Sequence, residues 1–314
     1  MKKIDLHAHY LSPGFNKFLD DYFDGKGDGV ATPPFSPQDY LALMEKLDID
    51  YGVLSISSPH ISAAPDKEML KLADEVNHYA ADIAQQHADK IGFFATLPLP
   101  LVDESIAMID DALDHQHAVG FTLPTNARGI YLGEDQLDAV MHKLNERHAV
   151  VAIHPNEPKP NIKVMSEEIL PPLMEFIFDT TRTIIYMSQK NVFSKYPNIK
   201  WIVPHGGALL PIIAQRINLG NKMFAVGKQP DDIEQVMHRL YFDLAGKVLP
   251  YQLQNILQCV DPNKIVYGSD APYTTDQVVT MLANELEQTN MVDDAMKKNM
   301  LYNNALALLP HLNK

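Results

Sequence analysis

The chain has 314 residues, of which 46% are hydrophobic and 21% charged, a composition that supports a large buried core. Its 40 acidic and 26 basic residues give a net charge of −14, which argues against nucleic acid or an anionic membrane surface as partner. Cys259 is the only cysteine, which excludes an internal disulfide. With no apolar run near 18 residues and no signal-peptide core, we expect a soluble, cytoplasmic protein.

Short apolar runs alternate along the chain with longer segments of helical spacing. We expect strands at 3–9, 51–57, 91–97, 118–123, 149–154, 200–205, 240–244 and 264–270. We expect helices near 37–47, 66–88, 103–114, 135–147, 171–196, 208–219, 251–259 and 275–287. Eight strand–helix repeats predict an α/β fold, a single (β/α)8 TIM-type barrel over residues 1–314. The alternative, an open doubly wound sheet, should carry a glycine-rich phosphate loop after its first strand, where this chain has His-Ala-His.

Two segments exceed a minimal barrel. Residues 10–36 form an insertion after the first strand that is rich in glycine, proline and aromatic residues, and 293–309 has the pattern of an extra C-terminal helix. The run 24–29 (Asp-Gly-Lys-Gly-Asp-Gly) fits neither a phosphate loop nor a calcium loop. We therefore expect residues 10–36 to be a mobile lid or rim loop over the barrel mouth.

Several expected strands end in residues that bind metals. Side chains alternate along a strand, so His7 and His9 point the same way and can hold one ion between them. His154, His205 and Asp270 stand at the ends of the fifth, sixth and eighth strands. Active sites of such barrels are built at the carboxyl ends of the strands, so all five side chains should meet at one mouth.

This residue set suits one divalent ion, with zinc as the expected metal and one coordination position left for water. A bound ion lowers the pKa of its water to about 7, so a proton carrier is needed. Four ligands are enough, and we assign His205 as the general acid or base, because it stands on another strand and is followed by two glycines. Binuclear barrels of this type often bridge their metals with a carboxylated lysine on the fourth or fifth strand, and neither 120–124 nor 149–154 contains one.

The remaining histidines serve as a comparison set. His60 follows the second strand and could reach the mouth, whereas His115 and His117 precede the fourth strand, on the opposite face. Asp5 shares the strand parity of His7 and His9, so two readings stay open: it orients a histidine, or it is a buried carboxylate paired elsewhere. The other histidines are expected away from the mouth, because His148 and His238 precede strands, His311 lies in the tail, and the rest fall within helical patterns: His78, His87 and His142.

In these motifs the chain resembles the amidohydrolase superfamily. Within it, the chain resembles the branch of aminocarboxymuconate semialdehyde decarboxylase and the non-oxidative aromatic decarboxylases, and most of all proteins described as methylsalicylate decarboxylase-like. The resembling stretches run almost end to end: 4–9, 92–100, 131–133, 153–155, 178–182, 203–211, 240–243, 266–272 and 303–306.

The resemblance implies that His7, His9, His154 and Asp270 hold zinc or a similar ion and that His205 is the acid or base. It also implies a homodimer in which Arg216 reaches across the interface to the substrate carboxylate in the partner's site. The semialdehyde decarboxylase uses a further arginine shortly before its second strand, where this chain has Glu-Lys-Leu-Asp at 45–48, so the same substrate is not expected. Arg128 and Arg182 are other candidate carboxylate partners, and Arg182 has a structural role as its alternative.

Three functions fit these residues. The first is a mononuclear metal-dependent decarboxylase of a small aromatic or unsaturated carboxylic acid. The second is a hydrolase of a lactone or amide that uses the same metal-bound hydroxide. The third is a non-catalytic metal-binding or sensor protein, which the presence of His205 beside the ligands disfavours. The first two need identical ligands, so only CO₂ release separates them.

Overall fold

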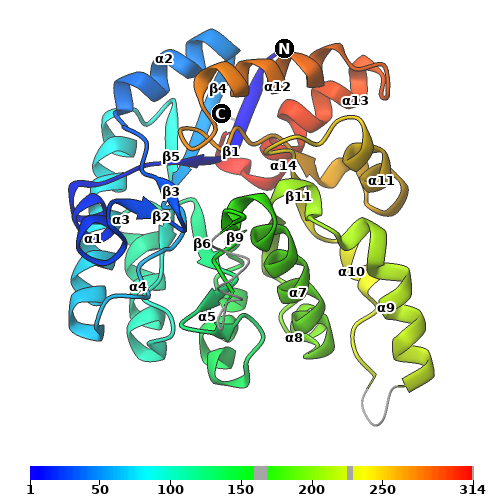
Figure 1. Cartoon of the computed structure of the whole chain (residues 1–314), viewed down its shortest axis with the longest axis horizontal. Helices are drawn as coiled ribbons and strands as arrows, with labels where there is room; N and C mark the ends of the chain where they lie inside the picture. The colour runs from blue at the N-terminus through cyan, green and yellow to red at the C-terminus, as the bar shows by residue number, and fades with distance from the viewer. Residues whose placement is uncertain (159–167, 225–228, 313–314) are drawn as a thin grey trace.

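Eight parallel strands form a barrel in the computed structural model, which describes residues 1–158, 168–224 and 229–312 (Figure 1). Two bridges, Asp5 with Tyr267 and Ala8 with Ala271, join the last strand to the first and close the barrel. The predicted (β/α)8 fold is confirmed. In sheet order the strands are β1 (Lys3–His9), β4 (Ile49–Ser55), β5 (Ile91–Thr96), β6 (Gly120–Pro124), β9 (Val150–His154), β10 (Lys200–Val203), β11 (Tyr241–Asp243) and β12 (Ile265–Val266).

Helices surround the strands, as Figure 1 shows. The helices after successive strands are α2 (Pro37–Leu47), α3 (Asp66–Gln86), α4 (Val102–Asp114), α5 (Asp138–Glu146), α7 (Glu175–Gln189), α9 (Leu210–Phe224), α11 (Tyr251–Cys259) and α12 (Asp276–Gln288). The helix expected at 171–196 is divided into a 3-10 turn at Pro171–Leu173, α7 and α8 (Val192–Lys195). A further short helix, α10 (Ile233–Met237), precedes β11. Within the described residues, no helix combines the length and apolar character needed to cross a membrane.

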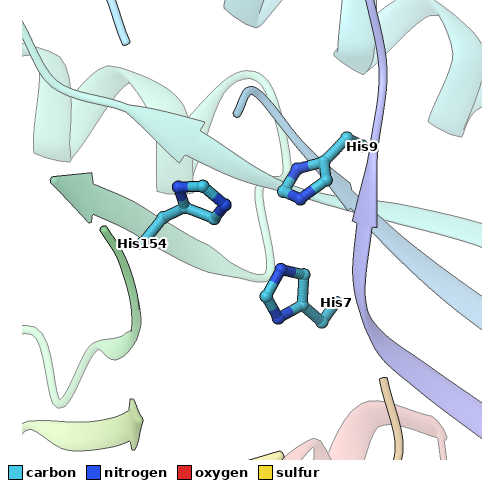
Figure 2. A group of neighbouring side chains, drawn as sticks. All are labelled: His7, His9 and His154. Atoms are coloured by element: carbon cyan, nitrogen blue, oxygen red, sulfur yellow. The ribbon is translucent and has the colours of Figure 1, made fainter. Parts of the chain in front are cut away.

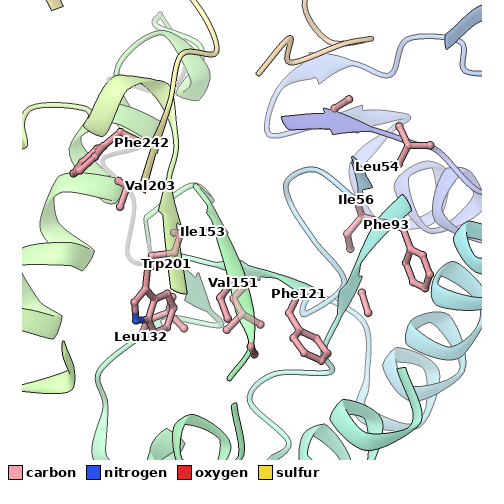
Figure 3. Packing of buried hydrophobic residues seen from close by; sticks show 14 of the residues in the cluster. Leu54, Ile56, Phe93, Phe121, Leu132, Val151, Ile153, Trp201, Val203 and Phe242 are labelled. Atoms are coloured by element: carbon pink, nitrogen blue, oxygen red, sulfur yellow. The ribbon is translucent and has the colours of Figure 1, made fainter. Parts of the chain in front are cut away.

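The sheet packs apolar side chains on both of its faces, as strands of a closed parallel barrel must. Figure 3 shows outward-facing side chains from neighbouring strands, among them Leu54, Phe93, Phe121, Val151 and Trp201, packed in the layer between strands and helices. A second cluster fills the lower interior of the barrel, with members from β1, β4, β5, β9, β10, β11 and β12: Ile4, Leu6, Tyr51, Val53, Phe94, Val150, Ile202, Tyr241 and Val266.

The first strand contains one extra residue. Asp5 pairs with Gly52 and Ala8 pairs with Leu54, so three steps along β1 lie opposite two steps along β4. Such a β-bulge reverses which side chains face inward. Below it Ile4 and Leu6 face the barrel interior, and above it His7 and His9 face the interior as well.

The insertion at 10–36, which we expected to be a mobile lid or rim loop, contains regular structure, while its mobility stays a prediction. It contains helix α1 (Pro13–Phe23), whose Phe15, Phe18 and Leu19 are buried, and a small hairpin of β2 (Lys26–Gly27) and β3 (Val30–Ala31). Ser12 caps α1 by accepting a hydrogen bond from the amide of Phe15 at 3.0 Å, and proline occupies the first turn. The hairpin nevertheless lies at the rim, because Gly27 and Val30 line the cavity described below.

The C-terminal segment expected as one helix is divided into α13 (Asp294–Lys298), a π-helical turn at Asn299–Asn303 and α14 (Asn304–Leu308). Ala305, Leu308 and Leu309 join the apolar cluster inside the barrel. The segment therefore closes the barrel floor, at the end opposite the strand termini that carry the histidines.

Because α1 is packed, truncating its core contact should unfold the protein more easily. We expect Phe15→Ala to lower the free energy of unfolding by about 3–5 kcal/mol, measured by chemical denaturation. Asn16→Ala, an exposed position on the same helix, is the matched control and should change stability little. Equal stability of the two variants would show that Phe15 does not stabilise the fold, and that α1 is not packed on the barrel.

Candidate metal and catalytic centre

The barrel interior changes from apolar to polar along each strand. On β9 the inward positions run from Val150 through Ala152 to His154, and on β11 they run from Tyr241 to Asp243. The polar ends meet above the apolar cluster, at the carboxyl ends of the strands. This is the end of such barrels where active sites form.

Figure 2 shows the rings of His7, His9 and His154 facing a common centre. The ring centroids lie 5.0 Å apart for His7 and His9, 4.9 Å for His9 and His154, and 5.6 Å for His7 and His154. One nitrogen of each ring can be chosen so that all three lie within 4.8 Å of one another, and all three side chains are buried. His7 and His9, which are neighbours on β1, and His154, which comes from the distant strand β9, therefore lie together at one point of the barrel mouth.

Asp270, from the loop after β12, lies beside His7 and His9, and with His7 and His205 it forms a second group of possible metal ligands. Its backbone amide donates to the His7 carbonyl at 2.7 Å, which ties the loop to the bulged strand. The Oδ1 atom then lies 3.2 Å from Nε2 of His9 and 3.6 Å from Nε2 of His7. A side chain at Gly268 would collide with His7, because a Cβ there would lie 2.6 Å from the His7 Cβ.

Hydrogen bonds orient each histidine so that Nε2 faces the centre. Nδ1 of His7 donates to Asp243 Oδ2 at 2.8 Å, and Nδ1 of His154 donates to the Pro155 carbonyl at 2.9 Å. Nδ1 of His9 lies 3.3 Å from the Ser55 hydroxyl, which in turn donates to the carbonyl of Ala8. A proton on each Nδ1 leaves the Nε2 lone pairs free to bind a metal.

This donor set fits a divalent ion. The Nε2 atoms of His7 and His9 are buried without a hydrogen-bond partner, an arrangement that is costly unless something else binds them. Nitrogen and oxygen ligands about 2.0–2.1 Å from a tetrahedral ion lie about 3.3–3.4 Å from one another. The distances from Asp270 Oδ1 to His9 and His7, 3.2 and 3.6 Å, bracket that value.

The charges of the cluster depend on burial and on the two aspartates. Burial lowers the pKa of His154 and of His9, which keeps both imidazoles neutral. Burial also lowers the pKa of His7, but the adjacent Asp243 outweighs it and raises the value to about 9, so a metal that binds Nε2 must displace a proton from it. Burial would raise the pKa of Asp270, yet the nearby His9 and His7 hold it below its usual range, so its carboxylate stays ionised.

His205 lies at the same mouth, beyond the end of β10 and at the start of a short turn, His205–Gly207, rather than on the strand itself. Its backbone is left-handed, with φ of +54°, and its amide donates to Asp243 Oδ1 at 2.9 Å. Its ring centroid is 5.2 Å from that of His7, and its Nδ1 is buried without a partner. Burial, followed by the proximity of His7, lowers the pKa of His205.

A cavity of about 540 Å³ opens beside these residues. Its polar wall includes Ser57, His154, His205, Asp270 and Tyr273. Its apolar wall comes from the hairpin and the start of α7: Val30, Pro172, Leu173, Phe176 and Ile177.

Other polar residues considered from the sequence lie elsewhere. Asp5 does not orient a histidine ring, because the bulge turns it outward: it accepts from the Tyr40 hydroxyl of α2 at 3.0 Å and from the backbone amides of His7 and Ser269. His60 is buried with its ring 5.6 Å from that of His154, but it does not line the cavity. His115 and His117 line a separate cavity with Tyr51, away from the mouth.

The candidate arginines differ in their surroundings. Arg182 pairs with the buried Asp179 at 2.6 Å, and Arg128 binds Asp66 and the carbonyls of Ser62 and Ala64. Both are therefore engaged in structural contacts. Arg216 lies exposed on α9 and is not among the residues that line the cavity of its own chain. Among the described lining residues, Lys247 is the one cation, and it is paired with Glu285.

Our sequence reasoning missed Asp243 and Tyr273. Asp243 stands at the end of an expected strand, so the rule that found His154 and Asp270 could also have found it. No pattern distinguished Tyr273, which lies three residues after Asp270 in the following loop.

The contact between Asp243 and His7 can be tested by metal binding. In the variant Asp243→Asn, the amide oxygen could still accept from the His205 amide. The variant would lose the second oxygen, which accepts from Nδ1 of His7. We expect Asp243→Asn to weaken divalent-metal binding about 10–100-fold, measured by competition with a chromogenic chelator. Asp103→Asn, at an exposed carboxylate of α4, controls for surface binding. Unchanged affinity in Asp243→Asn would remove Asp243 from the site.

Comparison with known proteins places this geometry in a family. Residues 4–311 match the family described as Amidohydrolase. A decarboxylase of Aspergillus niger, yanB, is 30% identical over 99% of this chain and 88% of its own length. The 6-methylsalicylic acid decarboxylase of Penicillium expansum is 26% identical over 99% of this chain and 97% of its own length.

Solved structures agree with the fold. A crystal structure described as an amidohydrolase II superposes with a TM-score of 0.94 at 39% identity, covering 98% of this chain and 100% of its own. A dihydroxybenzoic acid decarboxylase from Polaromonas, solved with manganese and the inhibitor 2-nitroresorcinol, superposes with a TM-score of 0.85 at 19% identity, covering 100% of this chain and 98% of its own.

Proposed function

This chain is an enzyme of the amidohydrolase family, and we propose that it is a metal-dependent decarboxylase of a small aromatic carboxylic acid. The observation that carries the proposal is the placement of His205, with an unpartnered ring nitrogen, on the wall of a cavity that also exposes His154 and Asp270. A metal-binding group and a proton carrier thus face the same space. The full-length similarity to decarboxylases supports the reaction type.

The residues that would hold the ion are His7, His9, His154 and Asp270. When bound, a divalent metal neutralises negative charge that develops on substrate oxygens. Zinc remains our proposal for the ion, with manganese, which the Polaromonas enzyme binds, as the alternative that metal analysis would identify.

His205 would move the proton. In the reaction the bond between the ring carbon and the carboxylate breaks, its electron pair stays on the ring carbon, and CO₂ leaves. His205 delivers a proton to that electron pair, which forms the C–H bond of the product. The hydrogen bond from its amide to Asp243, and a second one from Gln252 to its carbonyl at 2.6 Å, fix the backbone from which the ring projects.

The cavity favours a flat, partly apolar substrate. Phe176 is buried against His154, with ring centroids 6.0 Å apart and the rings nearly perpendicular. Leu173, Ile177 and Val30 extend this apolar wall. An aromatic ring can therefore lie along the apolar wall while its carboxylate and a neighbouring hydroxyl point toward the polar one.

The reaction is tested by CO₂ release from the metal-loaded protein with salicylate-type acids. We expect release by the wild type and a loss of about 10²–10⁴-fold in kcat for His205→Asn, with metal content unchanged. His142→Asn, at an exposed histidine of α5, is the control and should keep full activity. Cleavage of a lactone or amide without CO₂ release would instead establish the hydrolase.

A substrate carboxylate also needs a positive partner, and we propose that a second copy of the chain supplies it through Arg216. On α9 this arginine belongs to a stripe at helical spacing with Ile212, Leu219 and Met223, whose exposed fractions are 66%, 59% and 63%. Large apolar side chains exposed along one helix face are typical of a protein interface. The family resemblance of the sequence implies the same residue.

The mass in solution tests this arrangement. We expect a dimer at micromolar concentration, and we expect Arg216→Ala to raise KM about tenfold or more while the dimer persists. Arg239→Ala, at another exposed arginine, should leave KM unchanged. A monomeric, fully active wild type would exclude the trans role of Arg216.

A further inference from the structure

Tyr273 lies at the polar wall of the cavity, and the reaction proposed above gives it no role. It lies in the loop that begins at Asp270, where Thr274 donates from its backbone amide to the Asp270 carbonyl at 2.8 Å and from its hydroxyl to the Asp270 carboxylate at 3.1 Å. This turn brings the Tyr273 ring against His9, with centroids 5.6 Å apart and the planes at 81°. The side chain is thus fixed beside the metal-binding group.

The hydroxyl of Tyr273 is buried and makes no hydrogen bond of normal geometry, although the Ser57 side chain lies near it. Of the described residues that line the cavity, only His205 and Tyr273 have a buried side-chain polar atom without a partner. The proton-transfer role accounts for Nδ1 of His205. The Tyr273 hydroxyl is the one that remains.

The outer side of this hydroxyl is covered by the rim hairpin. A Cβ at Gly27 would lie 3.4 Å from the Tyr273 oxygen and 2.7 Å from the Ser58 carbonyl, so the hairpin backbone packs directly over both. The open direction is toward the cavity, which Tyr273 lines together with Asp270 and Ser57. A buried hydroxyl without a partner costs about 1–3 kcal/mol, a cost that a ligand atom would offset.

We infer that Tyr273 is a substrate-binding residue whose hydroxyl donates a hydrogen bond to an oxygen on the aromatic substrate, the carboxylate or the neighbouring phenolic oxygen. This rests on the proposed function for the identity of the ligand. Burial, and then the charges of Asp270 and Asp28, raise the pKa of Tyr273, so its phenol is neutral and able to donate at physiological pH. A neutral donor suits this position, because a cation beside the ligands would repel the metal.

Binding of unreactive analogues to the metal-loaded enzyme tests the inference. Benzoate carries only the carboxylate and phenol only the hydroxyl, so their affinities for wild type and Tyr273→Phe separate the two acceptors. We expect the variant to bind at least one of them about tenfold more weakly or worse. The analogue whose affinity falls identifies the acceptor oxygen, and unchanged affinity for both overturns the inference.

Thermal unfolding of the ligand-free variant distinguishes this role from a structural one. Removal of an unpartnered buried hydroxyl should leave the melting temperature unchanged or raise it, whereas removal of a hydroxyl that stabilises the fold should lower it. A lower melting temperature with intact ligand binding would assign Tyr273 to the fold and contradict the inference. Tyr186→Phe, which removes a hydroxyl bonded to Glu134 at 3.1 Å outside the cavity, should leave ligand affinity unchanged.

The two proposals fail separately. If the wild type binds benzoate but releases no CO₂ from any acid, the decarboxylase proposal fails, and the comparison of wild type with Tyr273→Phe still decides the role of the tyrosine. If the wild type releases CO₂ and the variant retains its KM and analogue affinities, the function stands and the inference about Tyr273 is wrong.

Discussion

The site depends on one extra residue in β1 and on the carboxylate that holds it. Strict alternation from Ile4 and Leu6 would turn Ala8 and Tyr10 into the barrel and leave both histidines outside. Asp5 stabilises the bulge by accepting from the amides of His7 and Ser269 and from the Tyr40 hydroxyl. Burial raises the pKa of Asp5 to about 6, although these hydrogen-bond donors lower it. Burying this carboxylate costs free energy, and its hydrogen bonds fix the geometry of the bulge.

Above the bulge, polar groups are arranged over an apolar floor. The lower interior is filled by aliphatic and aromatic side chains and closed from below by Ala305 and Leu308 of α14. The imidazoles rest on this floor with little solvent around them, which lowers the pKa of His9 and His154 and keeps their lone pairs available. The floor therefore stabilises the fold and also sets the protonation of the residues above it.

Prediction from the sequence succeeded where a rule depends on strand ends. His154 and Asp270 lie at one mouth, as expected for parallel strands whose carboxyl ends meet there, while their role as metal ligands stays a prediction. The eight apolar runs were sufficient to predict the barrel. For Asp5 the second open reading, a buried carboxylate paired elsewhere, is the one that the structure bears out, while its expected inward parity was wrong because a period of two cannot reveal an inserted residue. Helix α1 in the insertion was not foreseen, although Ser12 and Pro13 form a recognisable helix start. Tyr273 could not be found, since its position depends on a loop turn that only the folded contacts define.

Asp243 binds two different parts of the centre with one carboxylate. One oxygen accepts from the His7 ring, and the other accepts from the backbone of His205. His7 and His205, which we propose as metal ligand and proton carrier, are consequently coupled, and substitutions at the two should show non-additive effects in a double-mutant cycle. A change that moves the His7 ring would therefore also move the backbone of His205 through the shared carboxylate of Asp243.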